Sequence, residues 1–161
     1  MTASRELSEE LPTFVVPLQK SNILLPDATV AEIIPYEPLQ RVQDTPGWFL
    51  GLLAWRGVQV PVISFEMLTV KRASFSLVSV SSASLVILRA LGGWQGFQYF
   101  ALVAQAIPRL VKIQASELAE TVDEVAATEM LKARYGELLV SIPDIDFIES
   151  QIDQVTFDTS L

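Results

Sequence analysis

Residues 30–65 read VAEIIPYEPLQRVQDTPGWFLGLLAWRGVQVPVISF and contain two strongly apolar runs of the kind that form β-strands. The first run, Trp48 to Trp55, is apolar on both faces and predicts a buried strand. The second run, Val58 to Val62, alternates in hydrophobicity and predicts a strand that returns beside the first. Pro61 indicates that this second strand lies at a sheet edge or carries a bulge, because proline has no amide hydrogen for a ladder bond.

A tight turn at Trp55-Arg56-Gly57 joins the two runs. Gly57 can adopt a positive φ at little steric cost, so Arg56-Gly57 predicts a two-residue hairpin turn. The turn holds one cation beside large apolar side chains, and a guanidinium can make forked hydrogen bonds to a carboxylate or to backbone carbonyls. This combination favours recognition of another protein over catalysis. The alternative is an exposed turn arginine that pairs within its own chain.

The composition of the 161 residues excludes most catalytic chemistry. Half of the residues are apolar and 19% are charged, which indicates a folded domain with a real core and excludes a disordered chain. The sequence has no cysteine, and therefore no disulfide, thiolate nucleophile or cysteine metal site. It has no histidine either, which removes the usual general base and the commonest metal ligand. We therefore expect no catalytic residue, no metal site and no cofactor.

The net charge of −8 is unevenly distributed. Residues 1–112 hold nine basic and eight acidic side chains, whereas residues 113–161 hold two and eleven. An acidic final third argues against nucleic acid as a partner, because its phosphates would be repelled, and is otherwise a solubilising face. The N-terminal segment lacks the apolar region of a signal peptide, and no apolar run approaches the roughly 20 residues that span a bilayer. We expect a cytoplasmic protein without membrane insertion.

The rest of the chain predicts nine or ten short strands with few helices, a pattern typical of two small barrels. The serine-rich stretch Ser74 to Ser84 is expected to be a flexible connector and a divider between two lobes. Gly92 to Gly96 predicts a hairpin loop, since it lacks the lysine and the following helix of a phosphate-binding loop.

Short helices are predicted at Phe65–Thr69 and, capped by Ser116 with Glu117, through Glu120. A last helix is predicted to begin with Pro143 at its first position. Its apolar face is expected to carry three isoleucines and its start three acids, which fit the helix dipole better than a metal site. These residues are Ile145, Ile148 and Ile152, and Asp144, Asp146 and Glu149.

The segment from Val30 to Ile63 resembles the CheW family of chemotaxis scaffold proteins. The resemblance rests on Val30-x-Glu32-Ile33, on Pro46…Trp48…Leu50-Gly51, and on the fairly specific pattern Gly-x-x-x-x-Arg-Gly-x-x-x-Pro-Val-Ile from Gly51 to Ile63. A looser likeness runs from Phe14 to the C-terminal helix. The resemblance implies a mostly β fold of two interlocked five-stranded SH3-like barrels with short helices and a C-terminal helix. It also implies a single domain over residues 12–155, with flexible termini at 1–11 and 156–161.

The same resemblance implies a non-enzymatic adaptor. Such a protein couples the cytoplasmic tip of a chemoreceptor, a methyl-accepting protein, to a CheA-type histidine kinase by docking on the regulatory domain of the kinase. Three departures from the usual family pattern favour a divergent or accessory member, in a pathway that controls pili and twitching motility. Ala54 stands where Asn is usual, Ser64-Phe65 where Asp-Leu is usual, and Ala104-Gln105 where an Asp commonly follows the strand valine.

Five residues are expected to bind partners: Val30, Glu32, Ile34, Arg56 and Gly57. The resemblance places Val30 and Ile34 near the groove where receptor helices dock, and burial in the core is the alternative for both. Glu32 is expected to be exposed or paired, because an unpaired buried carboxylate is costly.

Three tryptophan side chains raise the same choice between core and contact surface. Trp48 and Trp55 supply large rigid areas that suit either role, and the core is expected for Trp55. Trp94, between glycines, is expected to be partly exposed.

Two other classes of function remain open at this point. A β-barrel could bind a small molecule in its apolar interior or between its lobes. An enzyme could depend on carboxylates alone, as glycosidases do, but no two acids are convincingly paired at the ends of apolar strands.

Overall fold

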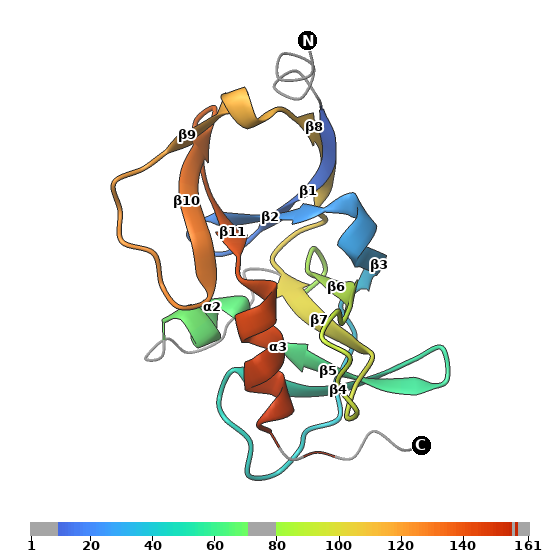
Figure 1. The fold of residues 1–161 in the computed structure, drawn as a ribbon. Helices are drawn as coiled ribbons and strands as arrows, with labels where there is room; N and C mark the ends of the chain where they lie inside the picture. The colour runs from blue at the N-terminus through green and yellow to red at the C-terminus, as the bar shows by residue number, and fades with distance from the viewer. Residues whose placement is uncertain (1–9, 71–79, 156, 158–161) are drawn as a thin grey trace.

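The computed structural model describes residues 10–70, 80–155 and 157. Two β-sheets make up most of it, one of six strands and one of five (Figure 1). The six strands follow a ring-shaped course in the upper half of Figure 1, and the five-stranded sheet lies below them with the C-terminal helix beside it. The predicted mostly β fold with two small barrels, short helices and a C-terminal helix is confirmed.

The six-stranded sheet combines the two ends of the chain. Its order is β8-β1-β2-β11-β10-β9, and all neighbours are antiparallel except β2 and β11, where Asn22 pairs with Val140 and Ile23 with Ser141. This parallel contact interlocks the first strands with the last hairpin. The strands are β1 (Leu11–Pro17), β2 (Asn22–Pro26), β8 (Arg109–Ile113), β9 (Leu118–Glu120), β10 (Glu129–Tyr135) and β11 (Leu138–Pro143).

The five-stranded sheet is built from the middle of the chain in the order β3-β6-β7-β5-β4. Because β5 and β6 both belong to this sheet, the serine-rich stretch between them does not divide two lobes, and that prediction is wrong; residues 74–79 of the stretch lie outside the described part. The strands are β3 (Val30–Pro35), β4 (Phe49–Trp55), β5 (Val58–Ile63), β6 (Ser84–Arg89) and β7 (Tyr99–Ala104).

Pro61 does not mark a sheet edge, because β5 lies between β4 and β7. The bulge in the β4–β5 pair falls between Phe49 and Gly51 on the other strand. Pairing of β5 with β7 covers only Val62 and Ile63, so it begins one residue after the proline. A proline is tolerated in this interior strand because no β7 residue is paired opposite it.

Four short helical segments complete the described fold: η1 (Asp27–Thr29), α2 (Phe65–Thr69), η2 (Ala115–Glu117) and α3 (Ile145–Asp153). Pro143 ends β11 instead of starting α3, and Asp144 caps the helix by accepting a hydrogen bond from the Phe147 amide at 3.1 Å. The helix expected through Glu120 stops at Glu117, because the following residues pair with β10, and its cap is Gln114 instead of Ser116.

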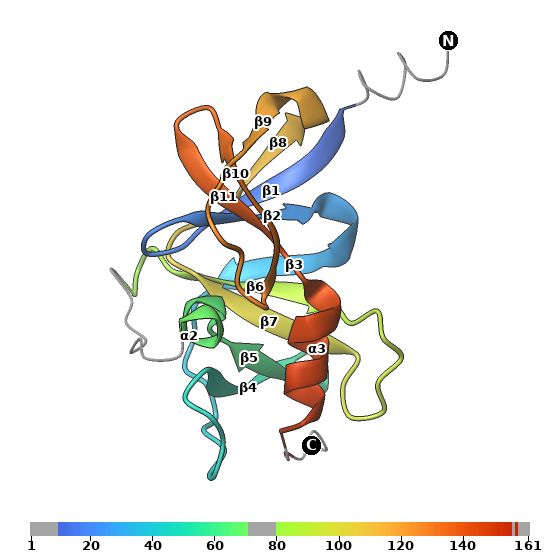
Figure 2. The same cartoon turned by 60° about the vertical axis from the view of Figure 1, so that its left-hand side comes forward.

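The largest buried cluster takes its members from both sheets and from α3, the helix that lies beside the five-stranded sheet in Figure 2. Ile23 and Leu25 of the six-stranded sheet, Phe100 and Leu102 of the five-stranded sheet, and Ile148 and Ile152 of α3 all belong to it. The predicted apolar face of the last helix is therefore confirmed. A shared core of this kind makes the two barrels one folding unit.

Two residues within the expected termini are held by the described structure. Leu11 pairs with Ile113 in the six-stranded sheet, and the Phe157 ring lies 5.2 Å from the Phe49 ring. Residues 1–9, 156 and 158–161 of those termini lie outside the described part.

Candidate partner-binding site

The β4–β5 hairpin turns at Arg56-Gly57 as the sequence predicts. Arg56 has a φ of 48° and Gly57 a φ of 79°, so both turn residues are left-handed, as in the type I′ turns that suit twisted hairpins. For glycine this conformation costs little, whereas for an L-residue with a side chain it costs about 1–2 kcal/mol. Arg56 is thus held in a strained conformation at an exposed tip, with 68% of its side chain accessible.

Three side chains meet at this tip. Glu32 Oε1 accepts a hydrogen bond from Trp55 Nε1 at 2.9 Å and lies 3.0 Å from Arg56 Nη2. The Arg56 guanidinium also lies over the Trp55 ring, 4.9 Å from its centre, within the range of a cation–π contact. Glu32 is therefore paired, as expected for a carboxylate among apolar neighbours. Arg56 pairs within its own chain and still exposes most of its donors to a partner.

The strand that carries Glu32 contains a bulge, which decides the direction of its side chains. The register of β3 against β6 shifts between Val30 and Glu32, so that Val30 opposes Leu88 and Glu32 opposes Ile87. Val30 consequently packs against the core between the sheets, whereas Ile34 packs against the inner core of the five-stranded barrel. A regular strand would place residues 30, 32 and 34 on one face. Here Glu32 and Ile34 share a face, and Val30 lies on the other.

Three further residues position this site. Trp55 packs against the five-stranded barrel core but is only half-buried, and its indole N–H donates a hydrogen bond to Glu32. The Tyr99 ring meets the Trp55 ring edge to face at 4.9 Å. Arg89 Nη1 donates to the carbonyls of Ala28 and Val30 at 3.2 and 3.1 Å, which fixes the start of β3. No pattern in the sequence indicates these contacts beyond an aromatic residue at two strand ends.

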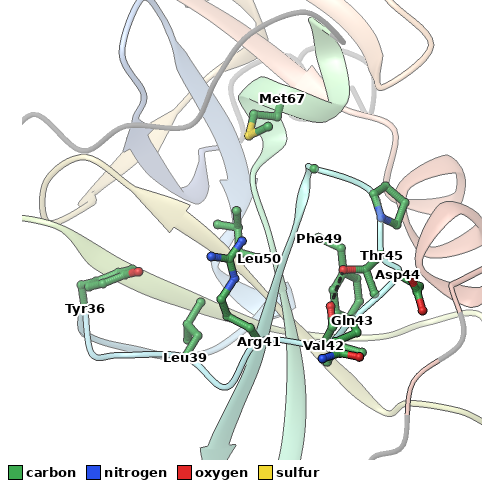
Figure 3. Close-up of a pocket in the computed structure, with 12 residues that line it drawn as sticks. Tyr36, Leu39, Arg41, Val42, Gln43, Asp44, Thr45, Phe49, Leu50 and Met67 are labelled. Atoms are coloured by element: carbon green, nitrogen blue, oxygen red, sulfur yellow. Dashed lines mark hydrogen bonds between the residues drawn. The ribbon is translucent and has the colours of Figure 1, made fainter.

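A cleft of about 830 Å³ opens beside the end of β3 (Figure 3). In Figure 3, Tyr36 and Leu39 lie at one end of the lining and Asp44 and Thr45 at the other. The loop that lines the cleft is held against β4 by two backbone hydrogen bonds, in which the Gln40 amide donates to the Leu52 carbonyl at 2.9 Å and the Leu52 amide to the Gln40 carbonyl at 2.8 Å. The remaining lining residues are Arg41, Val42, Gln43, Pro46, Gly47, Phe49, Leu50 and Met67.

Gly51 permits this close approach of the loop to β4. A side chain at this position would place its Cβ atom 2.5 Å from the Gln40 carbonyl oxygen, and the φ of Gly51 is 146°. Only glycine tolerates both conditions. The first glycine of the family-like pattern is therefore required by the fold, because it holds the loop that lines the cleft.

The described residues contain no group of three or more His, Cys, Asp or Glu side chains that could hold a metal ion. Of the three acids predicted at the start of the last helix, Asp144 caps α3 from the residue before it, Asp146 is exposed in the first turn, and Glu149 binds the loop after β6. No helix in the described ranges is long and apolar enough to cross a membrane. What the site offers is a strained hairpin tip at which the exposed Arg56 is paired with Glu32 and supported by the Trp55 ring, an arrangement suited to binding.

The family model of the CheW-like domain matches residues 12–148, most of the chain and all the residues of this site. The chain belongs to the CheW-like domain family. Its fold is also similar to the crystal structure of the scaffolding protein TtCheW from Thermoanaerobacter tengcongensis, with a TM-score of 0.69, 17% sequence identity and 84% of each chain covered. At that identity the likeness concerns the fold. No curated protein matches the sequence.

Within this CheW-like domain, the departures from the usual pattern have different structural weight. Ser64 caps α2 by accepting from the Met67 amide at 3.2 Å, a role that Asp also fills well. Phe65 is buried, so it replaces one apolar core residue by another. Gln105 is buried as well. Ala54 is exposed on β4 beside the hairpin tip, so among these departures it is the one that changes the surface.

Proposed function

We propose that this CheW-like domain is a non-enzymatic, cytoplasmic adaptor that couples a chemoreceptor tip to the regulatory domain of a CheA-type histidine kinase. The observation that carries the proposal is the Glu32–Trp55–Arg56 cluster at an exposed hairpin tip. Within a chain of this family, an arginine that a left-handed backbone places at an exposed tip, and that a carboxylate orients, is preorganised to bind a partner carboxylate or carbonyl.

The proposed partner face includes Glu32, Arg56 and Gly57 at the hairpin tip and Ile34 on the same face of β3 as Glu32, and assigns Val30 to a separate contact. Preformed ion pairs at an interface rim fix register and speed association more than they add affinity. The affinity would come from apolar surface beside the tip, where Val58 is exposed and Tyr99 half-buried. A scaffold of this type transmits receptor changes to the kinase by shifting populations at packed interfaces.

The exposed Ala54 supports a divergent or accessory member, and we extend the proposal to a pathway that controls pili and twitching motility. An Asn at this position would offer an amide beside the tip, whereas Ala54 offers only a methyl group. Replacing Ala54 by Asn tests this part. Tighter binding to a kinase regulatory domain from a flagellar pathway supports it, and unchanged binding contradicts it.

Calorimetry with the full chain tests the main proposal. The titrants are a purified kinase regulatory domain and a receptor signalling-tip fragment from the same organism. We expect Arg56→Glu to weaken binding about tenfold or more, since it replaces attraction by repulsion next to Glu32. Arg109→Glu is the matched control, because Arg109 is exposed on the other barrel. Wild-type protein that binds neither titrant contradicts the proposal.

The bulge in β3 adds a finer expectation. Ile34 shares the face of Glu32, so Ile34→Ala is expected to weaken the same interaction as Arg56→Glu, while Val30→Ala is expected to leave it unchanged. Equal losses from both truncations would contradict this assignment of faces.

A second candidate function, binding of a small apolar molecule, is favoured by a cavity of about 370 Å³ in the six-stranded barrel. Its volume lies within the range of ligand pockets, and its single hydroxyl, that of Thr13, already donates to the Leu11 carbonyl. A thermal-shift screen with uncharged apolar compounds tests it, and Ala115→Leu should abolish any shift by filling the cavity. The lining is completed by Leu24, Pro26, Ile113, Leu118 and Ile142.

A further inference from the structure

The glycine-rich loop between β6 and β7 surrounds an anion supplied by the chain itself. The backbone amides of Leu91 and Gly92 donate to the Glu149 carboxylate at 2.9 Å each, and Trp94 Nε1 donates to the same carboxylate at 2.9 Å. A second contact from Leu91 measures 3.2 Å. The sequence predicted only a hairpin loop here, because it lacks the lysine of a phosphate site. The three N–H donors are sufficient to hold a carboxylate without a lysine.

Glu149 is deeply buried, with 1% of its surface exposed, although it is ionisable. A buried carboxylate is tolerated only when hydrogen bonds replace its lost hydration. Within residues 10–70, 80–155 and 157 no basic side chain forms an ion pair with it. Among these residues, the hydrogen bonds that replace the lost hydration of the Glu149 carboxylate therefore come from the loop, and the loop is in turn shaped around the carboxylate.

Gly92 shows how closely the loop fits this anion. A Cβ atom at Gly92 would lie 2.5 Å from Trp94 Nε1 and 3.1 Å from Glu149 Oε1. Gly93, next in the chain, has a φ of 69°, which turns the chain back toward the indole. The two glycines thus allow the loop to close around the Glu149 carboxylate.

The same loop leads directly to the partner-binding tip. The Trp94 ring stacks on the Phe97 ring, with centres 6.3 Å apart and planes within 11°. Two residues later the Tyr99 ring meets Trp55, whose indole N–H holds Glu32. The Ala90 amide also donates to the Gln98 carbonyl at 2.9 Å and closes the base of the loop. Phe97 belongs to the core cluster shared by the two sheets and Tyr99 packs against the five-stranded barrel core, so the two rings are linked through the backbone at Gln98. We expect a displacement of the loop to reach Tyr99, which supports Trp55, along this backbone link.

We infer that Glu149 is a positioning residue for the partner-binding tip. From α3, its carboxylate occupies an anion receptor formed by Leu91, Gly92 and Trp94. The segment from Trp94 through Phe97 to Tyr99 then sets the orientation of Trp55, and Trp55 in turn orients the Glu32–Arg56 pair. The ligand class of this receptor is a small carboxylate. The part of the inference that concerns binding rests on the proposed function; the part that concerns Trp55 does not.

The experiment uses the full chain with Glu149→Ala and, as a matched control, Asp153→Ala, which removes an exposed acid from the same helix. The three indole N–H signals of Trp48, Trp55 and Trp94 are followed by ¹H–¹⁵N NMR. Sodium formate is then added, with sodium chloride of equal ionic strength as its control. Binding to the kinase regulatory domain is measured in the same solutions.

We expect Glu149→Ala to shift the Trp94 and Trp55 signals, and formate to move both back, while Asp153→Ala and chloride have no effect. Affinity for the kinase domain should fall by roughly threefold to thirtyfold and recover with formate. A purely structural role predicts loss of folded protein without recovery by formate. If Glu149→Ala does not fold, Glu149→Gln keeps the size and one acceptor oxygen, and the Trp55 signal is compared in that variant.

Two results overturn the inference. One is a folded variant, Glu149→Ala or Glu149→Gln, in which the Trp55 signal is unmoved. The other is a folded Glu149→Ala protein whose Trp94 signal does not respond to formate. If the wild-type chain binds no kinase domain, the proposed function fails while the Trp55 signal still tests the positioning role.

Discussion

Arg56 is held in a left-handed conformation at the hairpin tip, and replacing it by Ala and by Gly separates the cost of that conformation from the value of its contacts. Both variants lose the ion pair with Glu32 and the contact with the Trp55 ring. Only the Gly variant is relieved of the left-handed strain, since Ala carries a Cβ atom and Gly does not. The difference between the two variants therefore reports the strain.

The magnitudes follow from the geometry. The Arg56 side chain is 68% exposed, so its ion pair is screened by water and contributes about 0.2–1 kcal/mol, and the cation–π contact adds about 0.5–1 kcal/mol. Arg56→Ala should thus lower the free energy of unfolding by about 0.7–2 kcal/mol. Arg56→Gly regains about 1–2 kcal/mol of strain but loses about 0.5–1 kcal/mol to the greater backbone freedom of the unfolded chain. The middles of these two ranges make the Gly variant about 0.75 kcal/mol more stable than the Ala variant.

Urea unfolding followed by circular dichroism measures these free energies without depending on the nearby Trp55 fluorescence. Gly57→Ala is the internal control: its φ is 79° and a Cβ atom there would meet nothing within 4 Å, so its net cost, about 0.75 kcal/mol, is the strain less the gain from the smaller backbone freedom of the unfolded chain. An Ala variant at position 56 that equals or exceeds the Gly variant in stability, while Gly57→Ala is clearly destabilising, would refute the argument that Arg56 is strained.

Two other substitutions test the packing that supports the site. Gly92→Ala should lower the free energy of unfolding by about 1–3 kcal/mol, because the added Cβ atom would overlap Trp94. A Cβ atom at Gly96 would meet nothing within 4 Å, so Gly96→Ala should change the free energy of unfolding by less than about 0.5 kcal/mol. Thermal unfolding compares the two variants, and equal effects would contradict the close fit of the loop. Ile148→Ala, in the fully buried face of α3, should cost about 2–5 kcal/mol in urea unfolding, and Ile145→Ala, at a half-buried position, clearly less. A small loss at Ile148 would mean that α3 is not part of the shared core.

Local features of the site could be predicted from the sequence because they depend on neighbouring residues. The Arg56-Gly57 turn follows from two apolar runs that meet at a glycine, and the apolar face of α3 follows from the helical spacing of its isoleucines. The family resemblance supplied the two-barrel fold. It could not supply the contact between Glu32 and Trp55, since these residues are 23 positions apart and meet only after β3 has taken its place at the sheet edge.

The errors have physical causes of the same non-local kind. The serine-rich stretch resembled a divider because composition does not reveal that strands on both sides of it join one sheet. Pro61 suggested an edge, because the sequence does not reveal that β7 begins to pair with β5 only at Val62. The sequence indicates a helix start at Glu149, and no residue near it along the chain indicates that a loop about 55 residues earlier donates hydrogen bonds to its carboxylate. The bulge that turns Val30 away from Glu32 leaves no pattern in the sequence either.

The parallel pairing of β2 with β11 also sets an order of events during translation. The middle barrel has all of its strands once Ala104 has left the ribosome, whereas β2 gains its second neighbour only after Val140 and Ser141 have been made. Until then the N-terminal hairpin exposes an unpaired strand edge, a template for misassembly between nascent chains. Ribosomes arrested shortly before residue 140 should therefore carry an N-terminal hairpin that is still accessible to proteases and chaperones.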